Sequence, residues 1–364
     1  MWERRAFLKA AGAGFAASLL PRAAFALESA EVLFASSVLL PDGSFGAAIV
    51  TERGDVLRTI ALPARGHDVT FSREAGKAVV FARQPGTFAV VFEPTGDTAP
   101  VTVTSPAGRH FFGHGVFSAD GRLLYATEND FDGGRSTIGI YDVAGGYGRL
   151  GEFDTRGIGA HEVLLSPDGG YLVVANGGIE THPDYGSAEL NLATMDPSLV
   201  FIDTASGDLI GQLRLAAELH QLSIRHLAFD ARGRVWFGCQ FKGSDSDTPQ
   251  LVGYGTCEGE IRLFELPRQL LVNLRNYVGS VAASHDGRTI AVSSPQGDVI
   301  LAIDAEGRRP TVAAALRNGC GIAPDGAGFL ASSGDGVLVG LAGAAVPERQ
   351  VAVKFDNHLR ALPG

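Results

Sequence analysis

The sequence predicts an all-β protein, a seven-bladed β-propeller with four-stranded antiparallel blades. Three observations lead to this prediction: the glycine content, an internal repeat, and two chain ends that complement each other. Glycine makes up 48 of the 364 residues, roughly twice its usual share of about 7%, and hydrophobic residues make up 45%. Many tight turns between short, buried strands account for both values.

Each repeat opens with a short strand, a turn of the Asp-Gly type and a second apolar strand, which is the pattern of a β-hairpin. Clear copies lie at residues 66–72, 113–125 and 160–172, and weaker copies at 225–230, 279–287 and 319–326. The equivalent positions 67, 114, 161, 226, 280 and 320 are spaced by 47, 47, 65, 54 and 40 residues. These spacings bracket the usual blade length of about 40–50 residues.

A second hairpin follows the first in every repeat and consists of an apolar strand, a glycine-containing turn and another strand. Two hairpins give the four strands of one propeller blade. The apolar strands are predicted at Phe88–Phe92, Ile138–Tyr141, Leu199–Ile202, Leu251–Tyr254, Val299–Ile303 and Val337–Leu341.

The two ends of the chain supply the seventh blade. Residues 357–361 resemble 225–229, an innermost strand, and nothing follows them, whereas 31–40 and 45–62 provide three strands that lack an innermost partner. Joining the ends closes the ring and leaves no unpaired sheet edge. Two stacked β-sandwiches, the alternative architecture, would not explain why the ends complement each other.

Residues 1–26 have the features of a twin-arginine export signal. Arg4-Arg5-x-Phe7-Leu8-Lys9 is followed by a short apolar run and by Ala24-Phe25-Ala26, which has the form of a cleavage site. A membrane anchor and a first helix of the fold are the two alternatives to an export signal. The run is too short for an anchor, which needs about 20 apolar residues. We therefore expect a periplasmic protein, with residues 27–364 forming a single propeller domain and no membrane span in the mature form.

The charge balance argues against nucleic acid as a partner. The net charge is −10, and the leader, with Arg4, Arg5, Lys9 and Arg22 against Glu3, contributes +3, so that the mature chain carries −13. A protein of this charge lacks the positive surface that phosphate backbones require.

Five of the seven equivalent positions at the start of the innermost strands are histidine: His67, His114, His161, His226 and His358, with Ser280 and Cys320 at the other two. We expect these side chains to gather near the mouth of the central channel, where neutral imidazoles would suit Fe, Cu or Zn. Two alternatives stay open at this point. Each histidine could bridge to the backbone of the next blade, or the face could bind an anion, for which Arg109, Arg156 and Arg225 are available.

The longest repeat contains an extra polar loop at residues 176–197. An extended segment would present Glu180, His182 and Asp184 on one side, and Asn191 follows in the same loop. A lid over the channel, a surface that docks a partner and a plain solvated loop are all compatible with this pattern. The three cysteines, Cys239, Cys257 and Cys320, leave open either one Cys239–Cys257 bridge or three thiols.

The leader and the segments GHDVTFS, FFGHGVFS and AHEVLLSPDGGYLVVANGGIETHPDYG resemble the DUF1513 family of exported bacterial proteins. Its most specific part here is ANGGIETHPD with the following LNL and MDPSL. The resemblance implies a β-propeller and supplies no catalytic residues. It also implies an association with iron uptake, because genes of this family tend to lie beside those for imelysin-like iron-uptake proteins and a dihaem thiol-oxidoreductase-like protein.

These observations lead to a functional hypothesis and its rivals. The leading hypothesis is an exported binding module in periplasmic iron or metal acquisition, which binds a metal species or an imelysin-like partner at its histidine-bearing face. A metal- or cofactor-dependent oxidoreductase at the channel mouth is the alternative. A lactonase-like hydrolase comes last, because it needs carboxylates around a cation where this chain has histidines.

Overall fold

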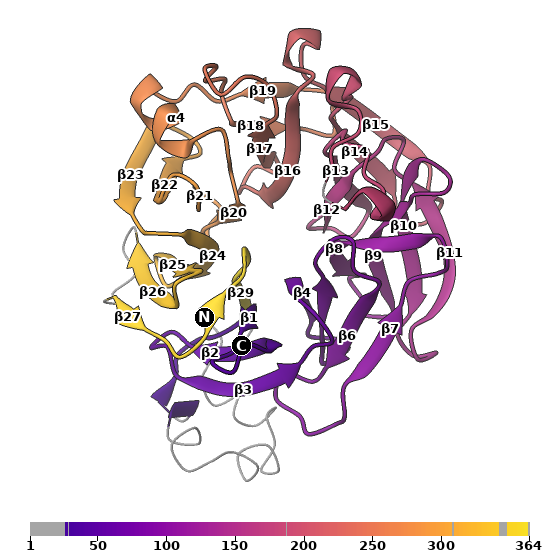
Figure 1. Ribbon diagram of the computed structural model, residues 1–364, viewed down its shortest axis with the longest axis vertical. Helices are drawn as coiled ribbons and strands as arrows, with labels where there is room; N and C mark the ends of the chain where they lie inside the picture. The colour runs from indigo at the N-terminus through magenta and orange to yellow at the C-terminus, as the bar shows by residue number, and fades with distance from the viewer. Residues whose placement is uncertain (1–25, 28, 187, 308, 342–347, 363–364) are drawn as a thin grey trace.

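The computed structural model describes residues 26–27, 29–186, 188–307, 309–341 and 348–362. Seven antiparallel sheets stand around a central axis, which confirms the predicted seven-bladed propeller (Figure 1). The predicted leader lies outside the described residues except for Ala26, which is buried beside Leu27 in an apolar cluster with the first blade. No helix in the described part of the chain is long and apolar enough to cross a membrane.

Each of the six blades within the chain has its strands in sequence order, so every connection inside a blade is a hairpin. In order from the N-terminus, the blades are β4 (Gly66–Ser72), β5 (Lys77–Ala82), β6 (Phe88–Phe92) and β7 (Val101–Thr104); β8 (Arg109–Phe117), β9 (Leu123–Asp130), β10 (Arg135–Asp142) and β11 (Gly148–Asp154); β12 (Ala160–Leu165), β13 (Tyr171–Asn176), β14 (Ser198–Asp203) and β15 (Leu209–Arg214); β16 (Leu222–Phe229), β17 (Val235–Phe241), β18 (Val252–Gly255) and β19 (Ile261–Leu263); β20 (Ser280–Ala283), β21 (Thr289–Ser294), β22 (Val299–Asp304) and β23 (Arg309–Ala315); and β24 (Gly319–Asp325), β25 (Gly328–Ser333), β26 (Val337–Leu341) and β27 (Arg349–Gln350).

The seventh blade joins the two ends of the chain, as the sequence predicts. β1 (Leu33–Leu39), β2 (Phe45–Thr51) and β3 (Val56–Ala61) come from the N-terminal side, and β28 (Lys354–Phe355) and β29 (Arg360–Leu362) from the C-terminal side. Both C-terminal strands pair with β1, with Val38 opposite Phe355 and Phe34 opposite Ala361. This pairing gives β1 a partner on each edge and closes the ring.

The predicted turn chemistry recurs at the inner hairpins. Gly121 and Gly169 both adopt the left-handed conformation, with φ of 69° and 76°. Before each glycine a serine hydroxyl donates to the aspartate two residues on, Ser118 to Asp120 and Ser166 to Asp168, at 2.6 Å in both turns. Repetition of one turn explains why the repeat is visible in the sequence.

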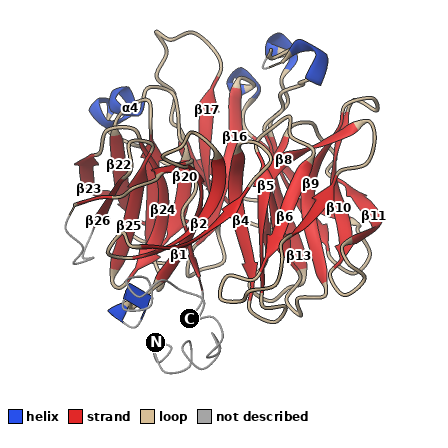
Figure 2. Ribbon diagram, turned by 60° about the horizontal axis from the view of Figure 1, so that its bottom comes forward, coloured by secondary structure: helices blue, strands red, loops and turns tan. Residues whose placement is uncertain are grey.

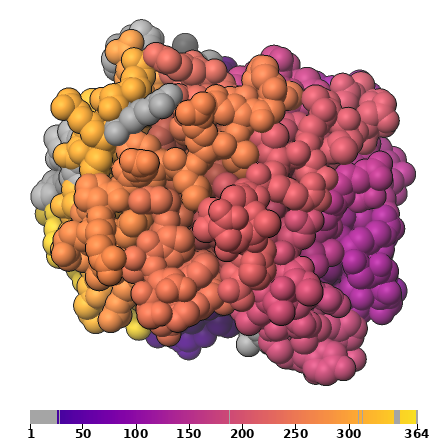
Figure 3. Space-filling view, turned by 90° about the horizontal axis from the view of Figure 1, so that it is seen from above, coloured from indigo at the N-terminus to yellow at the C-terminus, as the bar shows by residue number. Residues whose placement is uncertain are grey.

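The short helices, η1 (Pro183–Tyr185), η2 (Leu192–Thr194), η3 (Ala217–Leu219) and α4 (Arg268–Leu274), lie in the connections. In Figure 2 the labelled helix α4 lies at one end of the ring of blades, at the upper left of the view. The space-filling view shows the blades of the second half of the chain, in salmon and orange, forming one closely packed outer surface (Figure 3). Apolar clusters lie between neighbouring blades, which face each other through their sheets.

The closing blade yields a test of the fold. Leu359 is buried at 1% exposure in the cluster between the last and the closing blade, and Leu359→Ala is expected to lower the free energy of unfolding by about 2–5 kcal/mol through the cavity that it creates. Leu209→Ala, at a position 42% exposed on β15, is the matched control and should cost less than about 1 kcal/mol. Urea unfolding followed by circular dichroism measures both, and equal costs would contradict the closed ring.

Candidate metal centre

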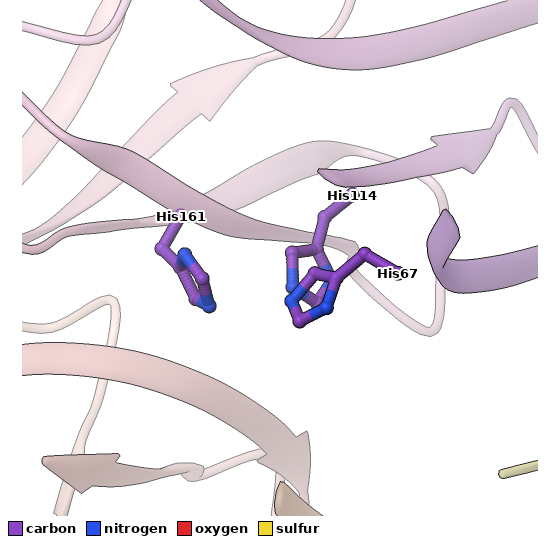
Figure 4. Close-up of side chains that lie close together, drawn as sticks. All are labelled: His67, His114 and His161. Carbon is purple, nitrogen blue, oxygen red and sulfur yellow. The ribbon is translucent and has the colours of Figure 1, made fainter. Parts of the chain in front are cut away.

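The five histidines singled out by the repeat come together at the axis of the propeller. Each belongs to an innermost strand or, for His358, to the residues just before β29. The pairing register shifts at the histidine in four of these blades, between Gly66 and Val69, Phe111 and Gly115, Ala160 and Val163, and Ile224 and His226. A β-bulge of this kind re-aims a side chain, and Figure 4 shows His67, His114 and His161 projecting into the same central space.

The rings are arranged as a pyramid. His114 contacts the other four rings at centroid separations of 4.8 to 5.7 Å. Those four contact one another in the cyclic order His67, His161, His226, His358, also at 4.8 to 5.7 Å. His114 is therefore the apex, and the other four form the base.

This spacing matches a set of imidazoles around one ion. Two imidazoles bound at right angles through Nε2, with a metal–nitrogen distance of about 2.1 Å, have ring centres about 4.5 Å apart. The ligand atoms of His67, His114 and His161 lie within 4.8 Å of one another, and so do those of His114, His226 and His358. The two triples share His114, so both sets of rings meet at the same apical residue.

Gly113 makes room for this packing. It adopts φ of 104°, and a Cβ there would lie 2.6 Å from the ring of His67. A residue with a side chain at this position would be strained and would push His67 away from His114.

Four Nε2 atoms in the cluster, those of His67, His114, His226 and His358, are buried and have no hydrogen-bond partner. Burial lowers the pKa of His67 to about 4, although the hydrogen bond to Asp356 opposes the shift. Burial also lowers the pKa of His161, His226 and His358. These imidazoles are therefore neutral at pH 7, which is the form that binds a metal.

Carboxylates orient three of the rings through Nδ1. Asp68 lies 3.0 Å from Nδ1 of His114, Glu162 lies 3.3 Å from Nδ1 of His226, and Asp356 lies 3.3 Å from Nδ1 of His67. Because an ionised carboxylate only accepts, each of these Nδ1 atoms donates its proton to the carboxylate, which leaves Nε2 as the ring atom available to a metal ion.

These carboxylates stay ionised despite their burial. Burial would raise the pKa of Glu162, but Arg360 and the hydrogen bond with His226 lower it to about 2. Burial would also raise the pKa of Asp356, but the contacts with His67 and Arg65 outweigh this effect and lower the pKa to about 2. The orienting partners are therefore fixed as acceptors across the physiological range.

Arg360 connects two of the carboxylates beneath the cluster. Its Nε and Nη2 donate to Asp68 at 2.8 and 2.6 Å, and Nη2 also donates to Glu162 at 2.8 Å. Asp68, His114 and Glu162 also form a group of ligand type, but Arg360 already neutralises both carboxylates. We therefore assign the two carboxylates, Asp68 and Glu162, to positioning rather than to metal binding.

Nδ1 of His161 accepts a hydrogen bond, whereas Nδ1 of the three rings above donates one. Nη1 of Arg225 lies 3.3 Å from its Nδ1, and because a guanidinium only donates, this Nδ1 accepts. Arg225 was one of three arginines singled out by the sequence. The other two lie elsewhere: Arg109 pairs with Glu128, Asp130 and Glu152 inside its own blade, and Arg156 pairs with Asp154 at the surface.

A cavity of about 330 Å³ meets the cluster on one side. His67, His161 and His226 line it, together with side chains that include Arg83, Arg225 and Lys242. His114 is fully buried and is not part of the lining, so the cavity approaches the base of the pyramid and not its apex.

The loop 176–197 forms part of the cavity wall, through Ile179, Thr181, Gly186 and Glu189. Gln84 donates to the hydroxyl of Thr181 at 2.7 Å, and Lys242 pairs with Glu189 at 2.6 Å. Contacts from two blades thus hold the loop in the wall of the cavity.

The segment predicted to be extended through Glu180, His182 and Asp184 turns instead, although Nδ1 of His182 still lies 3.7 Å from the carboxylate of Asp184. The chain turns at His182 into η1, whose Asp184 N–H donates to Nδ1 of His182 at 3.2 Å. Asn191 stabilises the loop. Its Oδ1 accepts from the N–H of Glu180 at 2.7 Å, and its Nδ2 donates to the carbonyl of Gly178 at 3.0 Å. Proline at 183 and the short polar caps favour this turn over an extended segment.

Ser280 and Cys320, at the two positions without histidine, are buried. The thiol of Cys320 contacts the backbone oxygen of Asp356 at 3.0 Å, and burial raises its pKa to about 12. Cys239, Cys257 and Cys320 are all free thiols.

Comparisons with known proteins identify a family and a fold. Residues 60–362 match the family model described as "Protein of unknown function (DUF1513)". No curated protein matches the sequence.

Among solved structures, the chain is similar to the periplasmic gluconolactonase PpgL of Pseudomonas aeruginosa. The TM-score is 0.61, the sequence identity is 16%, and the match covers 91% of this chain and 99% of that one. It is also similar to hydrazine synthase of Kuenenia stuttgartiensis, with a TM-score of 0.59 and 16% identity over 82% of this chain and 91% of that one. At this identity the likeness shows the propeller fold alone.

The buried ion pairs beneath the cluster give a prediction about stability. Arg360→Met leaves Asp68 and Glu162 as uncompensated buried charges and is expected to cost about 3–5 kcal/mol. Arg317→Met, which removes an ion pair with Asp335 from a side chain 80% exposed, should cost less than about 1 kcal/mol. Urea unfolding in the presence of a chelator measures both, and a small effect of Arg360→Met would contradict the positioning role.

Proposed function

We propose that this chain, which belongs to the DUF1513 family, is an exported metal-binding propeller whose channel histidines hold one divalent transition-metal ion. The observation that carries the proposal is the set of four buried Nε2 atoms that have no hydrogen-bond partner. Each buried polar atom without a partner costs about 1–3 kcal/mol. A metal ion at the common centre would remove this cost for all of them at once.

The ligand set favours some ions over others. Imidazole suits divalent Fe, Cu, Ni and Zn. With His161 as a fifth ligand, the pyramid would offer more ligands than the four that structural zinc sites use, so we place Fe(II) and Cu(II) ahead of Zn(II). The carboxylates on Nδ1 of His67, His114 and His226 are the partners that metal-binding histidines need for orientation and basicity.

We place this function in the periplasm, in metal acquisition. The twin-arginine leader and the iron-uptake context of the family support this location and role, with an imelysin-like protein as the partner. The burial of the cluster under the 176–197 loop favours a metal ion, rather than a protein surface, as what the histidines contact.

A second function, a metal-dependent oxidoreductase, is favoured by the cavity. The cavity reaches the base of the histidine pyramid, so a small molecule there could contact the ion directly. A reversible redox potential that shifts when small molecules enter the cavity would support this function. A loaded protein without any redox response would rule it out and leave metal binding in place.

Metal binding is the first test of the proposal. Protein freed of metal and titrated with Fe(II) without oxygen, and separately with Cu(II) and Zn(II), is expected to bind one ion per chain by calorimetry and elemental analysis. His114→Ala and His358→Ala each remove one ligand and are expected to weaken binding at least 100-fold, because second-shell changes alone cost about 10–100-fold.

The control for this titration is His182→Ala, which removes a histidine of the loop that lies outside the cluster. It is expected to bind the ion as the parent protein does. Failure of all three ions to bind the parent protein, or unchanged binding by His114→Ala, would contradict the proposal.

The orienting carboxylates give a second test. Asp356→Asn replaces the charged acceptor for Nδ1 of His67 with a neutral amide and is expected to weaken metal binding by about 10–100-fold. Asp184→Asn, at a loop side chain 82% exposed, is the matched control and should leave the affinity unchanged. Equal affinities for both variants would show that the carboxylate plays no part in metal binding.

A further inference from the structure

The cavity beside the histidine cluster carries cationic side chains that its own residues do not all neutralise. Lys242 is paired with Glu189 at 2.6 Å. Within the described part of the chain, the one carboxylate that pairs with Arg83 is Asp356, at 4.0 Å, and that carboxylate already pairs with Arg65 at 2.6 Å. The wall is therefore positively charged where the cavity meets the cluster.

Arg225 is the least satisfied of these cations. Its Nη1 contacts Nδ1 of His161, and its Nε is buried without a hydrogen-bond partner. Among the described residues, no carboxylate forms a salt bridge with it. A guanidinium in this state has donors to spare in the fork geometry that carboxylates accept.

The position of Arg225 relates the cavity to the proposed metal ion. The cavity is lined by three of the four basal histidines, and the apical His114 is not among its lining residues. A ligand in the cavity would thus approach the ion from the side opposite His114, next to the guanidinium that holds His161.

The rest of the lining sets the character of the ligand. Pro85, Phe112 and Ile179 give the cavity an apolar part. Its 330 Å³ corresponds to roughly ten water molecules at about 30 Å³ each, which is more than a simple inorganic anion needs.

We infer that the cavity binds a small organic carboxylate that joins the guanidinium of Arg225 to the metal ion. One carboxylate oxygen would bind the ion, and the other would accept from Arg225, with Arg83 adding to the attraction. The apolar part of the ligand would lie against Phe112 and Ile179. This inference rests on the proposed metal centre.

The same arrangement makes metal and carboxylate binding cooperative. Arg225 donates to Nδ1 of His161, and a carboxylate that takes up the guanidinium would release this nitrogen. The ring of His161 could then carry its proton on Nδ1 and present Nε2 to the ion, as the other rings do. Each ligand should therefore raise the affinity for the other by the same factor.

Acetate and its neutral isostere acetamide test the inference. The affinity of the parent protein for Cu(II) is measured by calorimetry with neither, with acetate and with acetamide, and the visible spectrum of the loaded protein is titrated with each. Acetate is expected to bind saturably and to raise the Cu(II) affinity about fivefold or more, whereas acetamide does neither. Arg225→Met is expected to bind one Cu(II) but to weaken acetate binding about tenfold or more.

Two controls separate this inference from the proposed function. The double variant Lys242→Met/Glu189→Gln removes a neutral ion pair from the same wall and should retain acetate binding, and thermal unfolding shows whether each variant is folded. A protein that binds one Cu(II) without a saturable response to acetate, or an Arg225→Met variant with parental acetate affinity, would overturn the carboxylate site alone. A protein that binds no metal ion would overturn the metal centre, together with the cooperative site built on it.

Discussion

The arrangement of the molecule depends on one constraint: five imidazoles share a buried space at the axis, and their ring nitrogens need fixed partners. The propeller meets this constraint between blades. Asp68 orients His114, Glu162 orients His226, and Asp356 orients His67, so that each carboxylate acts on a histidine of a following blade. The central cluster therefore forms only when the ring of blades is closed.

Closure of the ring of blades and assembly of the histidine cluster thus depend on the same C-terminal segment. The short segment from Asp356 to Arg360 brings an orienting carboxylate, a ring of the cluster, a buried leucine and the guanidinium that neutralises Asp68 and Glu162. The neighbouring strand β29 pairs with β1. A chain that failed to close here would lose core packing and metal ligands in the same step.

Much of the fold could be predicted from the sequence because one local device is repeated. The Ser-x-Asp-Gly turn at Ser118 and Ser166 marks the inner hairpins, and the repeat register brings the five histidines to equivalent positions. What lies between blades could not be predicted. Asp68 and Glu162 are adjacent in sequence to one histidine but act on another, 46 and 64 residues away, and a repeat does not reveal the bulges that aim the rings.

The loop at 176–197 shows the same limit. Its length and polarity predict a functional segment. The turn at Pro183 and the hydrogen bond from Glu180 N–H to Asn191 depend on contacts in the folded loop that the sequence pattern does not reveal. Arg225 was named in the sequence as one of three arginines available to an anion, whereas its donation to His161 requires the assembled channel.

X-ray absorption spectroscopy of the protein loaded with a single equivalent of Fe(II) or Cu(II) tests the central claim most directly, because scattering from imidazole rings counts the histidine ligands of the bound ion. The account predicts four to five imidazole nitrogens at about 2.0–2.1 Å. A first shell made of oxygen ligands with one imidazole or none would contradict it, since the ion would then lie outside the cluster at the propeller axis.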